Sequence, residues 1–134
     1  MRLLAIARQR DAAIQETSID SVAGLAGSVR VPGDKSISHR SIMLGAIAEG
    51  DTHISGFLEG ADALATLAAF EAMGVPIDQL GDGKLIVKGR GLHGLQAPVE
   101  SLYVGHSGTS LRLLAGFLAG QSVSATLPGA GAST

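Results

Sequence analysis

The amino-acid sequence predicts a mixed α/β fold of the α+β class, built from a repeated strand–helix unit. Three observations support this prediction. Stretches with alternating apolar residues, typical of strands, are interspersed with stretches of helical spacing, in the order βαβαββ. Glycine-rich turns separate these stretches. After Gly89-Arg90-Gly91 the strand–helix–strand order begins again, which indicates a second unit that is incomplete within this sequence.

Composition limits the classes of protein that the sequence can represent. The chain has 134 residues, enough for one domain or less, and 46% of them are apolar although only three Phe and one Tyr are aromatic. We therefore expect a mainly aliphatic core. The net charge of −2 gives no reason to expect a nucleic acid partner, and the absence of Cys excludes disulfides and thiolate metal sites. Charged residues within 1–11 argue against a signal peptide or membrane anchor, so we expect a cytoplasmic protein without a membrane partner.

The first half of the chain contains five expected elements. They are an extension or a helix at 1–16, with the extension favoured, a weak strand at 17–25, a strand at 29–31, a helix at 38–48 and a strand at 52–57. Asp34 is the expected N-cap of this helix and Gly50 its C′ residue. Its apolar stripe consists of Ile42, Met43, Ala46 and Ile47.

The second half continues the pattern. The expected elements are a helix from Asp62 to Met73, strands at 75–77 and 84–87, a strand at 101–104, a helix at 110–118 and a strand at 123–127. Gly81-Asp82-Gly83 predicts a hairpin, and Gly74 and Gly120 are expected to end the two helices. The expected apolar face of the first helix is formed by Ala63, Leu64, Leu67, Ala68, Phe70, Glu71 and Met73.

The start of the helix at 38–48 has the chemistry of an anion site. Lys35 and Ser36 fall in its first turn, and Arg40 lies four residues after Ser36 on the same face. A helix N-terminus offers free N–H groups and a partial positive charge, which favour a phosphate or carboxylate. The alternative is an ordinary capped amphipathic helix with solvated basic side chains.

A second helix start repeats this chemistry. Gly108 and Thr109 precede the helix at 110–118, and Arg112 follows three residues after Thr109. Alone, Ser107-Gly108-Thr109 is a common cap and Arg112 an ordinary surface residue. Two such starts together indicate one ligand with two anionic ends, or a pair of anionic ligands. The spacing of a nucleotide-binding P-loop is absent.

Three motifs carry a resemblance to a known family. Residues 31–40 (Val-Pro-Gly-Asp-Lys-Ser-Ile-Ser-His-Arg), 56–62 and 105–116 resemble the 5-enolpyruvylshikimate-3-phosphate (EPSP) synthases. The resemblance implies transfer of the enolpyruvyl group of phosphoenolpyruvate to the 5-hydroxyl of shikimate 3-phosphate, with release of phosphate, in aromatic amino-acid biosynthesis. It implies no metal and no organic cofactor. The implied fold is an inside-out α/β prism of βαβαββ units, of which this sequence would hold a truncated part.

The resemblance also assigns roles and boundaries. Lys35 would be catalytic and contact phosphoenolpyruvate; Ser36 and Arg40 would hold shikimate 3-phosphate; and Gly108, Thr109 and Arg112 would belong to the phosphoenolpyruvate pocket. His39 and His53 would be structural, the former by packing or capping, and Asp62 would be an N-cap. Residues 1–23 would be an extension or strand of uncertain placement, and 24–134 a partial N-terminal domain, with a full unit at 24–90 and an incomplete one at 97–134.

Two departures from the family pattern concern the ligand pocket. His106 stands where the family usually has Asn, and Leu113 where glyphosate-sensitive plant and enteric enzymes have Pro, so affinity for the inhibitor glyphosate is open. Two interpretations of the chain follow. It is a fragment, split subunit or short form of the enzyme, completed by a complementary C-terminal chain or by self-association. Alternatively, it is a non-catalytic module that binds anions or phosphate esters, or another protein.

Overall fold

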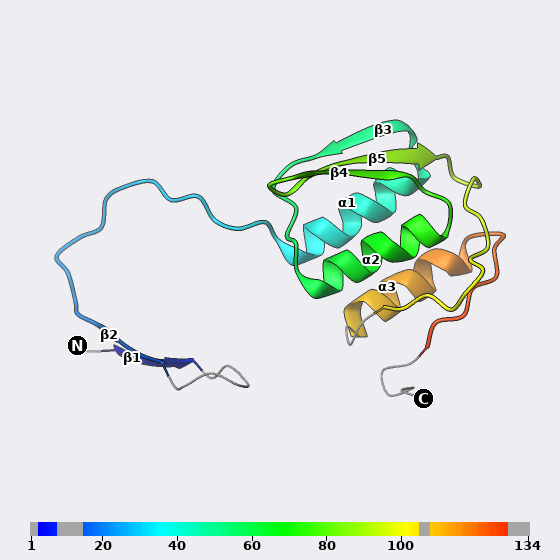
Figure 1. Ribbon diagram of the computed structural model, residues 1–134. Helices are drawn as coiled ribbons and strands as arrows, with labels where there is room; N and C mark the ends of the chain where they lie inside the picture. The colour runs from blue at the N-terminus through cyan, green and yellow to red at the C-terminus, as the bar shows by residue number, and fades with distance from the viewer. Residues whose placement is uncertain (1–2, 8–14, 105–107, 129–134) are drawn as a thin grey trace. The chain divides into compact units, whose positions relative to one another are not determined.

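The computed structural model describes residues 3–7, 15–104 and 108–128, and it divides the chain into two compact units, Met1–Val31 and Pro32–Thr134. In the first unit, β1 (Leu3–Ala7) pairs antiparallel with β2 (Gln15–Ile19), with Leu3 opposite Ile19 (Figure 1). The extension favoured at 1–16 thus contains a strand instead. The weak strand expected at 17–25 is present, but it begins at Gln15 and ends at Ile19.

The second unit packs helices on one face of a small sheet (Figure 1). Its elements are α1 (Lys35–Ile47), β3 (Glu49–Ile54), α2 (Ala61–Ala72), β4 (Ile77–Gly81), β5 (Lys84–Arg90) and α3 (Gly108–Ala119). The sheet has the order β3-β5-β4, and both pairings are antiparallel. Helix α1 packs against β5 and β3, α2 packs beside α1, and α3 packs against α2. This mixed α+β architecture agrees with the predicted fold class.

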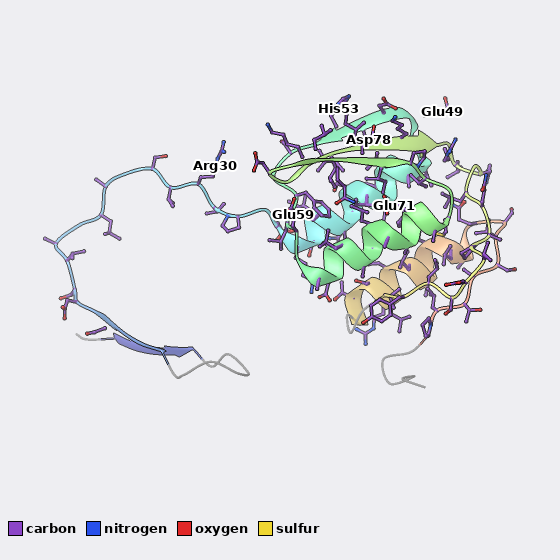
Figure 2. The ribbon with its side chains drawn as sticks, in the orientation of Figure 1. Arg30, Glu49, His53, Glu59, Glu71 and Asp78 are labelled. Carbon is purple, nitrogen blue, oxygen red and sulfur yellow. The ribbon has the colours of Figure 1, made fainter. Side chains whose placement is uncertain are left out.

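The core lies between the helices and the sheet, and it is mainly aliphatic as predicted. Its buried hydrophobic residues are Ile42, Met43, Ala46, Phe57, Ala63, Leu67, Ala69, Phe70, Met73, Val75, Ile77, Leu85, Val87, Leu95, Leu102, Val104 and Leu114. The other face of the sheet carries exposed polar side chains, among them His53 and Asp78 (Figure 2), each of which pairs in register with Ile86 of β5. The sheet therefore buries one face only.

Helix α1 lies close to the sheet because residue 45 is Gly. A Cβ atom built there would lie 3.2 Å from the Cβ atoms of both Thr52 and Val87, closer than side chains normally approach. The predicted apolar stripe is confirmed, since Ile42, Met43 and Ala46 are buried and Ile47 packs against them. The predicted C′ glycine is wrong: Ala48 caps the helix, and Gly50 lies in β3 with a φ of 93°.

The hairpin prediction is confirmed. Asp82 and Gly83 connect β4 to β5 with φ angles of 50° and 66°, the left-handed pair that a type I′ turn requires. Helix α2 ends as predicted, since Gly74 adopts a φ of 84° and its N–H donates to the carbonyl of Glu71. The strand expected at 75–77 instead runs from Ile77 to Gly81.

Three strand predictions are wrong. Residues 29–31 form no strand, and Val29 and Val31 are exposed, so the elements within 24–90, predicted as βαβαββ, have the order αβαββ. Residues 101–104 and 123–127 are not strands either, although the Leu102 N–H donates to the Thr126 carbonyl at 2.9 Å. A strand needs a paired neighbour, and no second strand pairs with these segments within the described ranges.

The predicted apolar face of α2 is partly wrong. Leu64, Ala68 and Glu71 are exposed, whereas Thr66 and Ala69 are buried against neighbouring elements. In the part of the chain that the structure describes, no helix has the length and apolarity needed to cross a membrane.

Candidate functional site

The start of α1 is fixed by its own cap and by the loop that precedes α2. The Asp34 carboxylate accepts from the Ile37 N–H at 2.8 Å, which confirms the predicted N-cap. The Ser38 hydroxyl donates to the Asp34 carbonyl and accepts from the Leu58 N–H at 2.9 Å. The backbone of Gly33 passes so close to Gly56 that a Cβ atom would lie 1.9 Å from its carbonyl oxygen. The first turn of α1 is therefore held in place by its N-cap, Asp34, and by the loop that precedes α2.

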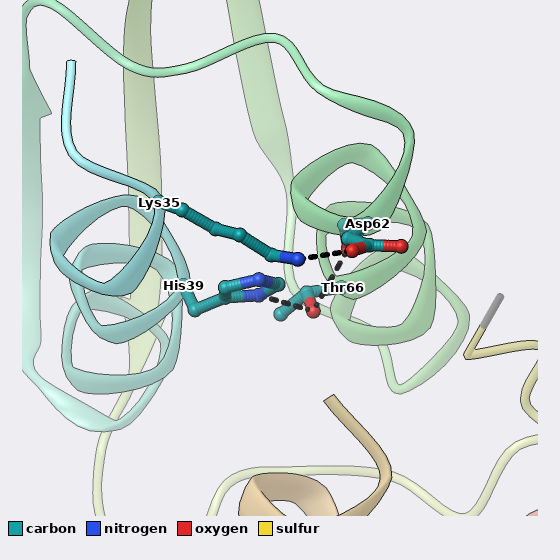
Figure 3. A network of polar contacts seen from close by, with 4 residues as sticks. All are labelled: Lys35, His39, Asp62 and Thr66. Carbon is teal, nitrogen blue, oxygen red and sulfur yellow. Dashed lines mark hydrogen bonds and ion pairs between the residues drawn. The ribbon is translucent and has the colours of Figure 1, made fainter. Parts of the chain in front are cut away.

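Lys35 is the first residue of α1, and its ammonium group forms an ion pair with Asp62 of α2 (Figure 3). The lysine side chain is 48% exposed and the aspartate 31%, so both can still meet a ligand from solution. The N-cap prediction for Asp62 is wrong: Gly60 is the N-cap of α2, and Asp62 lies in the first turn, where its carboxylate pairs with Lys35 of α1. The sequence motif alone gives no signal for this pairing, because it depends on how the two helices lie beside each other.

Ser36 and Arg40 lie on the exposed side of the same helix start. The Arg40 guanidinium donates to the Ser36 carbonyl at 3.3 Å, which draws the arginine back toward the first turn. The predicted grouping of Lys35, Ser36 and Arg40 near one helix N-terminus is therefore present. Two cations and a hydroxyl beside the positive end of a helix can together bind an anion.

His39 lies one turn after Lys35, and it is buried. Its Nδ1 atom is 2.9 Å from the Thr66 hydroxyl of α2, and a dashed line marks this hydrogen bond in Figure 3. Burial lowers the pKa of His39 below 6.5, and the positive charges of Lys35 and Arg40 lower it further against the opposing effect of Asp62. The ring thus stays neutral beside the cations of the site.

The second predicted anion site begins at α3. Gly108 and Thr109 are the first two residues of this helix, and both are exposed, as is Arg112. His106 and the rest of 105–107 lie outside the described residues. Figure 1 shows α1, α2 and α3 side by side, with their N-terminal ends at the same end of the helix layer. The two predicted anion sites therefore lie at one end of the unit, with the start of α2 between them.

Comparison with known proteins assigns this arrangement to a family. The family model described as EPSP synthase (3-phosphoshikimate 1-carboxyvinyltransferase) matches residues 19–132. The chain belongs to the EPSP synthase family. A 3-phosphoshikimate 1-carboxyvinyltransferase of Alkalilimnicola ehrlichii is 68% identical over 105 residues, which cover 78% of this chain and 24% of the relative. One of Methylococcus capsulatus is 60% identical over 103 residues, covering 77% and 24%.

Solved structures agree with this assignment. An EPSP synthase from Acinetobacter baumannii superposes with a TM-score of 0.73 at 57% identity, covering 78% of this chain and 24% of that structure. The fold expected from the family is thereby confirmed for this part of the chain. The chain spans about a quarter of the length of the curated relatives it matches. Within the described ranges, no three His, Cys, Asp or Glu side chains are grouped as a metal site would need.

Proposed function

We propose that this chain supplies the N-terminal part of a 3-phosphoshikimate 1-carboxyvinyltransferase, with residues 24–134 forming part of one domain. The observation that carries the proposal is the common placement of two basic helix starts in a chain of this family. Both substrates of the reaction, shikimate 3-phosphate and phosphoenolpyruvate, are anions. Two neighbouring anion sites are what a reaction between them requires.

We assign each residue the role that the family resemblance implies, and the position of each group supports this assignment. Ser36 and Arg40, on the exposed side of α1, bind the phosphate of shikimate 3-phosphate. Gly108 and Thr109 offer backbone N–H groups at the start of α3 to phosphoenolpyruvate, with Arg112 beside them. Lys35 lies between α1 and α2, where its ammonium group can reach the reacting centre. Glyphosate would bind in the phosphoenolpyruvate pocket.

The reaction joins the 5-hydroxyl oxygen to C2 of phosphoenolpyruvate while C3 gains a proton. The hydroxyl proton is removed, and the tetrahedral intermediate then loses phosphate and a C3 proton to form the enol ether of the product. Negative charge grows on the departing phosphate, and a fixed ammonium group such as that of Lys35 stabilises it. The groups that move protons would come from a complementary C-terminal part, since residues 115–134 carry no charged side chain.

Replacing the two cations at the start of α1 tests the proposal. Lys35→Ala and Arg40→Ala should each weaken binding of shikimate 3-phosphate by about 2–3 kcal/mol, the contribution of a charged hydrogen bond. Titration calorimetry measures this, with Lys84→Ala on the exposed start of β5 as the control. Unchanged affinity in both variants would contradict the assignment of this helix start to the substrate.

A further inference from the structure

Two polar links, one helical turn apart, join α1 to α2. Lys35 pairs with Asp62, and His39 bonds to Thr66, and each link spans 27 positions of the sequence. Residues four apart lie one above the other on a helix, so the two links form successive rungs between parallel helices (Figure 3). The outer rung is partly exposed, and the inner rung is buried.

The contacts of the inner rung favour one arrangement of its hydrogen atoms. The Thr66 hydroxyl has a single hydrogen, and the backbone carbonyl of Asp62 lies 3.4 Å away as its acceptor. In this arrangement Thr66 accepts from His39, and the neutral ring carries its hydrogen on Nδ1. Nε2 is then the unprotonated nitrogen, and it is buried without a hydrogen-bond partner among the described residues. A proton on Nε2 would leave an unpaired N–H in the interior.

The charged groups around the ring favour the same state. Lys35 and Arg40 on α1 oppose a positive charge on His39, and Asp62 on α2 favours it. Burial and the two cations together outweigh the effect of Asp62, so the pKa of His39 is lowered. His39 thus acts in the folded protein as a neutral, directional donor, and two successive hydrogen bonds connect its Nδ1 atom through the Thr66 hydroxyl to the backbone carbonyl of Asp62.

We propose that His39 is a positioning residue of the anion site, which through Thr66 holds Asp62, and hence Lys35, in place between α1 and α2. The identity of the ligand that Lys35 contacts rests on the proposed function, whereas the link from His39 to Lys35 does not depend on it. The reason is geometric. Asp62 pairs with Lys35 through its carboxylate and accepts from Thr66 through its carbonyl. A shift of the His39–Thr66 contact therefore also shifts Asp62 and, with it, Lys35.

Variants of both residues of the inner rung test the inference. His39→Asn places its side-chain amide nitrogen, at the same number of bonds from Cα, where Nδ1 lies, and it has no atom equivalent to Nε2. His39→Leu keeps bulk but removes the donor, and Thr66→Val keeps shape but removes the acceptor. His53→Asn on the exposed face of β3 is the matched control. Far-ultraviolet circular dichroism selects the variants that fold.

The first measurement needs no ligand. The imidazole nitrogen signals of His39 should show a hydrogen on Nδ1 and none on Nε2 at about pH 7. The Lys35 side-chain signals should move toward those of a free lysine in His39→Leu and Thr66→Val, and stay in place in His39→Asn and His53→Asn. A hydrogen on Nε2, or unmoved Lys35 signals in Thr66→Val, would overturn the inference.

The second measurement is calorimetric binding of shikimate 3-phosphate to the 134-residue chain. His39→Leu and Thr66→Val should each weaken binding about tenfold, and the double variant no more than either alone. His39→Asn should bind about as tightly as wild type, unlike His39→Leu. A histidine that only fills space would not need a replacement that donates a hydrogen bond. If the wild-type chain does not bind this ligand, the proposed function fails, and the ligand-free signals of Lys35 still decide the role of His39. If His39→Leu does not fold, Thr66→Val and His39→Asn carry the comparison.

Discussion

Lys35 owes its place to residues on two helices. The helix start that carries it could be predicted from the sequence, because Asp34 and the apolar stripe after it are local signals. Its pairing with Asp62 could not, since 27 positions separate the two residues and only helix packing brings them together. Both pairs, Lys35–Asp62 and His39–Thr66, are separated by 27 positions. This equal spacing indicates contacts only once the two helices are known to lie parallel and in register.

His39 should make stability depend on pH. Its pKa in the folded chain is lowered from 6.5, so the unfolded chain binds more protons below that value. The contribution is fully present above pH 6.5 and is lost as the pH falls below it toward the folded-state pKa. Thermal unfolding between about pH 5 and 8 should show this decline in wild type and in His53→Asn, and a smaller slope in His39→Asn. Equal slopes in wild type and His39→Asn would show that His39 titrates alike in both states.

At the level of elements, the contact between α1 and the sheet can be tested at one glycine. Gly45→Ala should destabilise the chain, because the new methyl group meets Thr52 and Val87 at 3.2 Å. Overpacking of this kind costs about 1–3 kcal/mol, more than the roughly 1 kcal/mol that Ala gains over Gly in a helix. Urea unfolding measures the difference.

Gly116 of α3 provides the matched control. It also lies within a helix, but a Cβ atom there meets nothing within 4 Å. Gly116→Ala should therefore stabilise the chain by about 0.5–1 kcal/mol. Stabilisation by both substitutions would mean that α1 can move away from the sheet without loss, and that Gly45 is not needed for their close approach.

The helices and the hairpin of this chain were predictable, and several strands were not. Apolar spacing and the Asp34 cap of α1 are local signals, so the presence of α1, α2 and α3 follows from the sequence, as does the turn at Asp82-Gly83. A strand exists only where a neighbour pairs with it. The segments at 29–31, 101–104 and 123–127 have suitable residues, but no described strand lies beside them. The left-handed φ of Gly50 likewise serves β3 rather than the end of α1.

For the whole molecule, we predict that this chain alone binds anions but scarcely turns over. It spans about a quarter of its relatives, and its last 20 residues, 115–134, bring no acid or base. Phosphate release from both substrates should be negligible for the purified chain and appear when a complementary C-terminal fragment is added. Release at about 1 per second or faster by the chain alone would contradict this. Binding without turnover in the presence of the fragment would favour the non-catalytic module.

The common direction of the three helices also bears on how fast an anion arrives. The positive ends of three helix dipoles gather at one end of the unit, although the chain as a whole carries a net charge of −2. An approaching dianion is repelled by the net charge at long range and attracted by this end at short range. Salt at physiological strength screens charges beyond about 8 Å, so it removes the repulsion first. We therefore expect the rate at which an anion meets this end of the unit to depend on the local field of the helix starts rather than on the net charge.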